Sequence, residues 1–150
     1  MSILFKQFMK DLKIGQLYEK IAIEHIIKYY KDKYQLIETN DDSRYDFILS
    51  NNKTYEVKAL LKVYMYQNIF IEYMAFKKPS GIQLTCANFY VFVLIDKGQV
   101  KQIIIISTSK LKRLISENKY IKNYIDELKA GYIFNLQFLI EQSLLIFDCE

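Results

Sequence analysis

An almost unbroken apolar run, Phe89–Ile95, constrains the fold of this chain more than any other feature. A strand that is apolar on both sides of its pleat has to be covered on both faces. Asp96-Lys97-Gly98-Gln99 follows with the residues of a hairpin turn, and Val100–Ile106 follows as the next strand. The sequence therefore predicts a strand inside a sheet, with other elements packed on both of its faces.

Hydrophobic spacing and turn residues predict the other elements. Helices are expected over residues 2–12, 16–30, 82–87, 110–118 and 120–128, with Ile14-Gly15 as a break and with caps at Ser80 and Ser107-Thr108-Ser109. Strands are expected over residues 34–38, 45–49, 54–60 and 68–76, and residues 62–66 either extend a strand or bend away. Asp41 and Asp42 are interpreted as loop acids, and the apolar tail 132–150 is expected to pack on the sheet or on a second copy.

Composition places the chain among ordinary single-domain proteins. Its 150 residues fit one domain over residues 1–150, with 51% hydrophobic and 25% charged residues. The first residues are not a secretory signal, and no apolar run approaches the roughly 20 residues that span a membrane. Cys86 and Cys149 are far apart and form no metal-spaced pair. We therefore expect an intracellular, soluble, cytoplasmic protein.

The predicted hairpin around Ser50-Asn51-Asn52-Lys53 carries charged residues on strands that are otherwise apolar. Because side chains alternate along a strand, Glu56 and Lys58 share one face, and Val57 points to the other. Asp46 begins the preceding strand. Charged side chains are rarely buried unless they are paired or bind metal, so this is either a functional site or an exposed hairpin with a salt bridge.

Glu19 is a second acid in an apolar setting. On a helix over residues 16–30 its neighbours on the same face are mostly apolar, namely Gly15, Ala22, Ile23, Ile26 and Tyr30. Lys20, Glu24 and Lys28 form a solvated stripe on another flank. Glu19 therefore needs a metal ion, a cation or a hydrogen-bond partner.

Together these residues resemble the core motif of the PD-(D/E)XK nuclease superfamily. Asp46 is followed after a short turn by Glu56-Val57-Lys58, and Gly15-Gln16-Leu17-Tyr18-Glu19 is similar to the acid-bearing helix that precedes the hairpin in that family. Tyr45 stands where the family commonly has proline. The order helix, hairpin, strand, short helix, two strands and helix over about residues 14–116 implies an α/β, restriction-endonuclease-like core with a central mixed sheet flanked by helices.

The resemblance implies a catalytic site for phosphodiester hydrolysis. Asp46 and Glu56 would bind Mg²⁺, which Mn²⁺ would replace, with the Val57 carbonyl as a third ligand. Glu19 would complete the site or bind through water. Lys58 would orient or help deprotonate the attacking water, or stabilise the charge on the phosphorane.

The resemblance also implies a partner. A compact domain of this kind looks most like a structure-selective DNA endonuclease of the Holliday-junction-resolvase type, which acts in DNA recombination as a homodimer. The stretch Pro79-Ser80-Gly81-Ile82 with Thr85 and Ala87 is similar to viral and phage-type members, which makes a viral or phage origin an alternative. Lys77, Lys78, Ser80 and Gln83 would offer donors to the phosphate backbone.

Charge is compatible with this partner. The net charge is +4, and the remainder of the chain is +6 once a site of Glu19, Asp46, Glu56 and Lys58 is set aside. A basic surface around an acidic pocket suits a polyanion, although a solvated lysine-rich surface gives the same total.

Several alternatives stay open at this level. The chain could be a catalytically inactive nucleic-acid-binding or interaction module, a restriction-type or repair nuclease, or a structural accessory subunit, and the sequence does not separate DNA from RNA. Glu72 could face the same pocket, hold Lys58 or pair with another lysine. His25 could approach a metal, but it lies off the helix face that carries Glu19.

Overall fold

A six-stranded mixed sheet forms the centre of the computed structural model, which describes residues 2–40 and 44–149. Its strands run in the order β1-β2-β3-β6-β7-β10, and among them the β3–β6 pair alone is parallel. Their bounds are β1 Leu36–Thr39, β2 Phe47–Leu49, β3 Thr54–Leu60, β6 Phe89–Asp96, β7 Gln99–Ser107 and β10 Leu145–Asp148. Tyr90–Ile95 of β6 are buried, which confirms the strand that was expected to be covered on both faces.

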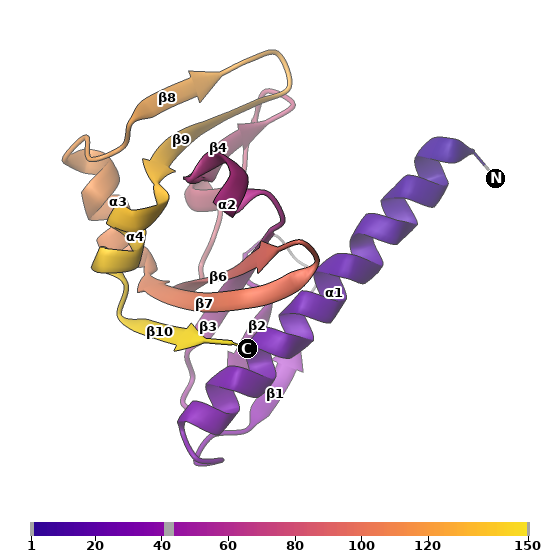
Figure 1. The fold of residues 1–150 in the computed structure, drawn as a ribbon, viewed down its shortest axis with the longest axis vertical. Helices are drawn as coiled ribbons and strands as arrows, with labels where there is room; N and C mark the ends of the chain where they lie inside the picture. The colour runs from indigo at the N-terminus through magenta and orange to yellow at the C-terminus, as the bar shows by residue number, and fades with distance from the viewer. Residues whose placement is uncertain (1, 41–43, 150) are drawn as a thin grey trace.

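One helix, α1 (Ile3–Tyr29), covers one face of this sheet (Figure 1). Its C-terminal half buries an apolar stripe against β6 and β7, made of Tyr18, Ala22, Ile23 and Ile26. The predicted break at Ile14-Gly15 is wrong, because the helix continues through both residues. Glycine inside a helix costs only about 1 kcal/mol, which the buried stripe outweighs.

Gly15 gives a first prediction. A methyl group there would meet no atom within 4 Å, so Gly15→Ala is expected to raise the free energy of unfolding by about 0.5–1 kcal/mol, through helix propensity alone. Urea unfolding measures this. The matched control is Gly131→Ala, whose methyl group would overlap the Phe70 ring and should destabilise the protein. A loss of stability in Gly15→Ala would contradict the prediction.

The other face of the central sheet is covered by a second, four-stranded sheet and by short helices (Figure 1). That sheet has the order β5-β4-β9-β8, with β4 Asn68–Ala75, β5 Lys78–Pro79, β8 Lys122–Ile125 and β9 Lys129–Asn135. The helices are α2 Val63–Tyr66, α3 Thr108–Ser116 and α4 Leu136–Gln142. The chain is thus an α/β protein with a mixed central sheet and flanking helices, as expected, but the strand at 68–76 belongs to a separate sheet.

Two other expectations need correction. Residues 120–128 contain the strand β8 and not a helix, because their Tyr and Ile residues pair with β9. The short helix at 82–87 is a single 3₁₀ turn, η1 (Gly81–Gln83). Of the two alternatives for residues 62–66, the structure has the second, since the chain leaves β3 and forms α2.

The next expectations are confirmed, except for one that concerns residues outside the described part of the chain. Ser107 caps α3 by accepting a hydrogen bond from the Lys110 amide at 3.2 Å. The tail packs on the central sheet by adding β10 to the edge of β7. Asp41 and Asp42 lie outside the described residues. Within residues 2–40 and 44–149, no helix is long and apolar enough to cross a membrane.

Candidate functional site

The candidate site lies at an edge of β3 that we call open, because no strand of the described residues pairs with this edge beyond Tyr55. Strand β2 pairs with β3 only through Phe47–Tyr55 and Ile48–Thr54, while β3 continues to Leu60. Beyond Tyr55, a side chain replaces the backbone of β2 as the hydrogen-bond partner of β3. Asp46 Oδ2 accepts a hydrogen bond from the Val57 amide at 2.6 Å. The amide and carbonyl of a strand residue point to the same neighbouring strand, so the Val57 carbonyl also points to this edge.

Glu56 and Lys58 form an ion pair on the face of β3 opposite α1. The Glu56 side chain is 9% exposed, and its Oε1 lies 3.2 Å from the half-exposed Lys58 Nζ. Its other oxygen, Oε2, is buried and has no hydrogen-bond partner. The pKa of Glu56 is raised to about 7, mainly because burial disfavours the charged form; Lys58 opposes this shift, and the Asp46 charge adds to it. A buried carboxylate in this state costs stability unless a cation engages it.

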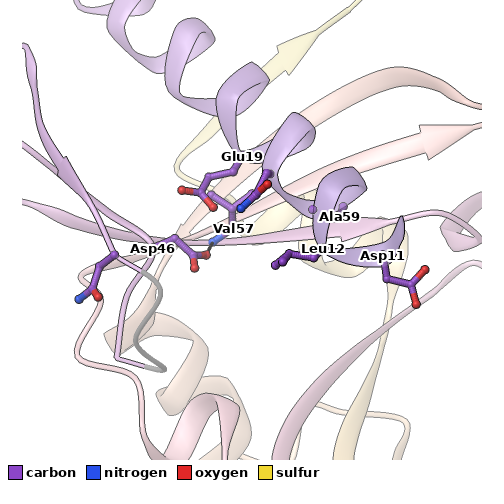
Figure 2. Close-up of a pocket in the computed structure, with 9 residues that line it drawn as sticks. Asp11, Leu12, Glu19, Asp46, Val57 and Ala59 are labelled. Atoms are coloured by element: carbon purple, nitrogen blue, oxygen red, sulfur yellow. Dashed lines mark hydrogen bonds between the residues drawn. The ribbon is translucent and has the colours of Figure 1, made fainter. Parts of the chain in front are cut away.

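Glu19 lies in a cleft of about 460 Å³ between α1 and β3. Figure 2 shows the Glu19 and Asp46 carboxylates close to Val57, with Asp11 further along the cleft. The full lining is Asp11, Leu12, Gly15, Gln16, Glu19, Asn40, Asp46, Val57 and Ala59. Glu19 and Asp46 thus line the same cleft. Asp46 also lies at the edge of β3, the strand that carries Glu56.

Glu19 and the Glu56–Lys58 pair lie on opposite faces of β3. Val57 and Ala59 face α1 and line the cleft with Glu19, so the alternation along the strand turns Glu56 and Lys58 away from it. Asp46 is the residue that both groups share. The five predicted residues therefore surround one strand edge instead of filling one pocket.

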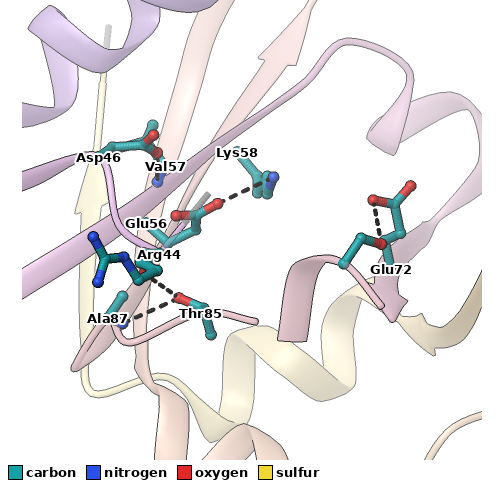
Figure 3. A network of polar contacts seen from close by, with 9 residues as sticks. Arg44, Asp46, Glu56, Val57, Lys58, Glu72, Thr85 and Ala87 are labelled. Atoms are coloured by element: carbon teal, nitrogen blue, oxygen red, sulfur yellow. Dashed lines mark hydrogen bonds and ion pairs between the residues drawn. The ribbon is translucent and has the colours of Figure 1, made fainter. Parts of the chain in front are cut away.

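Glu72 on β4 has a partner of its own. Its Oε2 accepts a hydrogen bond from the Ser80 hydroxyl at 3.0 Å, and the Lys58 ion pair is made with Glu56. Figure 3 shows the Lys58 amine between the Glu56 and Glu72 carboxylates in that view. Glu72 therefore lies on the Lys58 side of β3, but it does not hold Lys58.

The predicted phosphate contacts are arranged differently from a capped helix. Ser80 makes no side-chain cap on η1, because its hydroxyl is bonded to Glu72. Lys77 lies exposed on the turn between β4 and β5, Lys78 is exposed at the start of β5, and Gln83 is exposed at the end of η1. The two lysines and Gln83 remain accessible, whereas Ser80 supports Glu72.

His25 lies elsewhere. Its Nδ1 is 2.9 Å from the Ile21 carbonyl, and its Nε2 is 3.5 Å from the Cys149 sulfur beyond β10. The ring also packs against Phe147 of β10. His25 therefore contacts the C-terminal edge of the sheet, on the side of β7, while β3 carries the candidate site.

Thr85 is a supporting residue, to which the sequence assigned no role beyond its place in the stretch that is similar to viral and phage-type members. Its hydroxyl donates to the Arg44 carbonyl at 2.9 Å and accepts from the buried Ala87 amide at 3.1 Å (Figure 3). The Cys86 amide donates to the same Arg44 carbonyl at 2.6 Å. These bonds hold the chain two residues before Asp46, so residues 85–87 position Asp46 as it enters β2.

Thr85 gives a second prediction. Thr85→Val keeps the shape but leaves the buried Ala87 amide without a partner, so unfolding free energy should fall by about 1–3 kcal/mol. Chemical denaturation measures the change. Thr39→Val, at an exposed strand position, is the control and should stay within about 0.5 kcal/mol of wild type. Equal stability of Thr85→Val and wild type would refute the supporting role.

The donor set at this edge fits a divalent cation. Glu56 offers an unpartnered buried oxygen, Asp46 lies beside it, and the Val57 carbonyl points to the same edge. Mg²⁺ is usually bound through one or two carboxylates and keeps several waters. In the described part of the chain, no three acidic, cysteine or histidine side chains form a group that could hold a metal. The residues therefore fit a site of two carboxylates and one backbone carbonyl.

Comparisons with protein-family models and with curated proteins found no match to this chain.

Proposed function

We propose that the chain is a metal-dependent endonuclease of the PD-(D/E)XK type, with a restriction-endonuclease-like core. The observation that supports this most is at the open edge of β3, where Asp46 accepts from the Val57 amide next to Glu56, whose Oε2 is buried without a partner. Lys58 is paired with Glu56 and its side chain is 46% exposed, so it can reach a substrate. A structural salt bridge alone does not account for a buried carboxylate oxygen without a partner.

The chemistry is hydrolysis of one phosphate ester bond. Water adds across the bond, its hydroxyl going to phosphorus and its proton to the released sugar oxygen. Mg²⁺, when bound, polarises the phosphate and lowers the pKa of a water molecule. Asp46 and Glu56 would hold that ion, and Glu19 would act from the α1 face through water. Lys58, fixed by Glu56, would donate a hydrogen bond to the attacking water or to the scissile phosphate.

The proposed substrate is DNA, branched or duplex, with structure-selective cleavage of the Holliday-junction-resolvase type. A net charge of +4 favours a polyanion. Lys77 and Lys78 project from the β4–β5 turn on the layer that carries Glu72, and they are the residues we assign to the phosphate backbone.

A cleavage panel tests the proposal. Purified protein is incubated with Mg²⁺ or Mn²⁺ and labelled single-stranded, duplex, flap and four-way-junction DNA, with matched RNA, beside Lys58→Ala and Asp46→Ala. Cleavage that disappears in both variants and with chelator supports the nuclease, and the preferred substrate identifies its subtype. Binding without cleavage, unaffected by chelator, would overturn the enzyme and support an inactive binding module. Neither binding nor cleavage would leave a structural accessory subunit.

We further propose that the enzyme is a homodimer that joins through the first turns of α1. These turns project beyond the sheet (Figure 1), and they expose Ile3, Leu4, Phe5, Met9 and Leu12. Ile3 and Leu4 are 85% and 83% exposed. A second copy would cover the same apolar face on both chains, as a two-fold contact requires.

The dimer gives a third prediction. Light scattering after gel filtration should give twice the 18.0 kDa chain mass for wild type, and a single chain mass for the Leu4→Gln/Phe5→Gln double variant. Lys6→Gln/Lys10→Gln, which changes charged residues of the same turns, should remain dimeric. A wild-type monomer, or a double variant that still dimerises, would refute this interface.

A further inference from the structure

Tyr90 places a buried hydroxyl next to the candidate metal site. In the parallel pair of β3 and β6, Tyr90 lies in register with Glu56, so both side chains project from the same face of the sheet. The ring is 2% exposed and stacks on Phe92 with a centroid distance of 5.7 Å. Packing therefore fixes the direction of the ring, and the hydroxyl cannot turn out to solvent.

The Tyr90 hydroxyl and the Glu56 oxygen Oε2 are both buried without hydrogen-bond partners. One is a donor and the other an acceptor, and each costs about 1–3 kcal/mol when it is left unpaired. Burial raises the pKa of Tyr90 above its usual value, and the charges of Glu56, Asp46 and Glu72 raise it further. Tyr90 and Glu56 therefore place two unpartnered polar groups on the same face of neighbouring strands, in register.

We propose that Tyr90 is a positioning residue for the metal site, whose hydroxyl holds Glu56 Oε2 through one bound water. The two atoms are not hydrogen-bonded to each other in the structure, and a buried water typically joins polar groups that are otherwise unsatisfied. This inference rests on the proposed function. Tyr90 acts through Glu56 and does not touch the substrate, because its side chain is enclosed.

A fixed orientation of Glu56 matters for metal binding. Glu56 has one oxygen held by Lys58 at 3.2 Å, and that contact alone leaves the carboxylate free to turn about its last bond. A second contact at Oε2 fixes the carboxylate plane before the ion arrives. Partners of metal ligands commonly contribute about 10–100-fold to metal affinity or activity.

Tyr90→Phe tests the inference, because it removes the hydroxyl and keeps the ring. Calorimetric titration with Mn²⁺ should show an affinity about 10–100-fold weaker than wild type, without any need for substrate. In cleavage assays kcat should fall by a similar factor while KM for DNA stays unchanged. The unfolding free energy should be unchanged or higher, since an unpartnered hydroxyl is lost.

The matched control is Tyr64→Phe. The Tyr64 hydroxyl packs against the same core but has a partner, since it donates to Gln102 at 3.2 Å. This variant should lose about 1 kcal/mol of stability, and it should bind Mn²⁺ and cleave DNA as wild type does.

The outcomes separate this inference from the function on which it rests. If wild type binds Mn²⁺ and cleaves DNA, and Tyr90→Phe does so equally well, the inference is overturned and the proposed function stands. If Tyr90→Phe loses stability or cooperative unfolding in step with its activity, the hydroxyl is structural and the inference is overturned. If wild type neither binds Mn²⁺ nor cleaves DNA, both proposals fall.

Discussion

Lys58→Met is expected to lower kcat for DNA cleavage by about 10³-fold or more, which corresponds to about 4 kcal/mol of transition-state stabilisation. The Lys58 amine is the cation paired with Glu56 within residues 2–40 and 44–149, and the 46% exposure of its side chain leaves it room to contact the substrate. Methionine keeps the length of the alkyl chain and removes the charge. Because the lost contact is needed mainly in the transition state, DNA affinity should change much less than kcat.

Single-turnover cleavage and equilibrium DNA binding measure these two quantities separately. The control is Lys53→Met in the turn of the same hairpin, where the side chain is exposed and lies at the end of β3 away from Lys58. This variant should cleave as wild type does. If Lys58→Met retains cleavage that chelator abolishes, Lys58 has no catalytic role.

Glu56→Gln is expected to stabilise the metal-free protein at about pH 8 by about 3 kcal/mol while it abolishes metal-dependent cleavage. The pKa of Glu56 is raised to about 7 by burial, from an ordinary value of 4.5. A shift of one pKa unit corresponds to about 1.36 kcal/mol. The neutral amide of glutamine has no charge to bury, so this destabilisation is absent from the variant. Such a gain is typical where a functional residue is kept at the expense of stability.

The raised pKa of Glu56 also determines how the free energy of unfolding changes with pH. Between about pH 4.5 and 7 the folded protein holds a proton on Glu56 that the unfolded chain has released. The contribution of Glu56 to the free energy of unfolding therefore falls as pH rises from about 4.5 to 7, and it is constant above this window. The Glu56→Gln variant should lack this decline.

Urea unfolding in chelator across this pH range measures both effects. Glu117→Gln is the control, since Glu117 is exposed and pairs with Arg113 on the surface, where such a change is worth less than about 1 kcal/mol. Divalent ions should stabilise wild type and not Glu56→Gln, because binding to the folded state adds to its stability. A Glu56→Gln protein that is less stable than wild type at pH 8 would show that the ionised carboxylate is structural.

Local signals were sufficient where neighbouring residues determine the structure. The apolar run of β6, its Asp96-Lys97-Gly98 turn and the Ser107 cap of α3 each depend on a few adjacent residues, and the structure has them where the sequence predicts them. The hairpin from Asp46 to Lys58 is of the same kind. Its alternation predicts which side chains share a face, and this held for Glu56 and Lys58 against Val57.

Local signals could not predict which strands pair when they lie far apart in the sequence. Strand β4 pairs with β9, about sixty residues away, so nothing near residues 68–76 indicates that this strand leaves the central sheet. The helix expected at 120–128 failed for a different reason, because β8 pairs with β9 in a local hairpin and this pairing overrides the helical spacing. Gly15 was interpreted as a break because the cost of glycine in a helix is visible in the local sequence. The packing of α1 on β6 and β7, which outweighs this cost, depends on residues far away in the chain.

The arrangement of the candidate site was only partly predictable. The sequence grouped Glu19 with Asp46, Glu56 and Lys58, but it could not show that Glu19 approaches from the α1 face while Glu56 and Lys58 project from the other. The support that Thr85 gives and the role proposed for Tyr90 could not be predicted, because they depend on residues 41 and 34 positions away, Arg44 and Glu56.

The measurement that tests the central claim most directly is a crystal structure of the protein soaked in Mn²⁺, with its anomalous scattering recorded. We expect an ion at the open edge of β3, within about 2.1–2.3 Å of carboxylate oxygens of Asp46 and Glu56 and of the Val57 carbonyl. Glu56→Gln crystals should lack it. An empty edge in wild type, or an ion bound elsewhere, would contradict the metal site and with it the proposed nuclease.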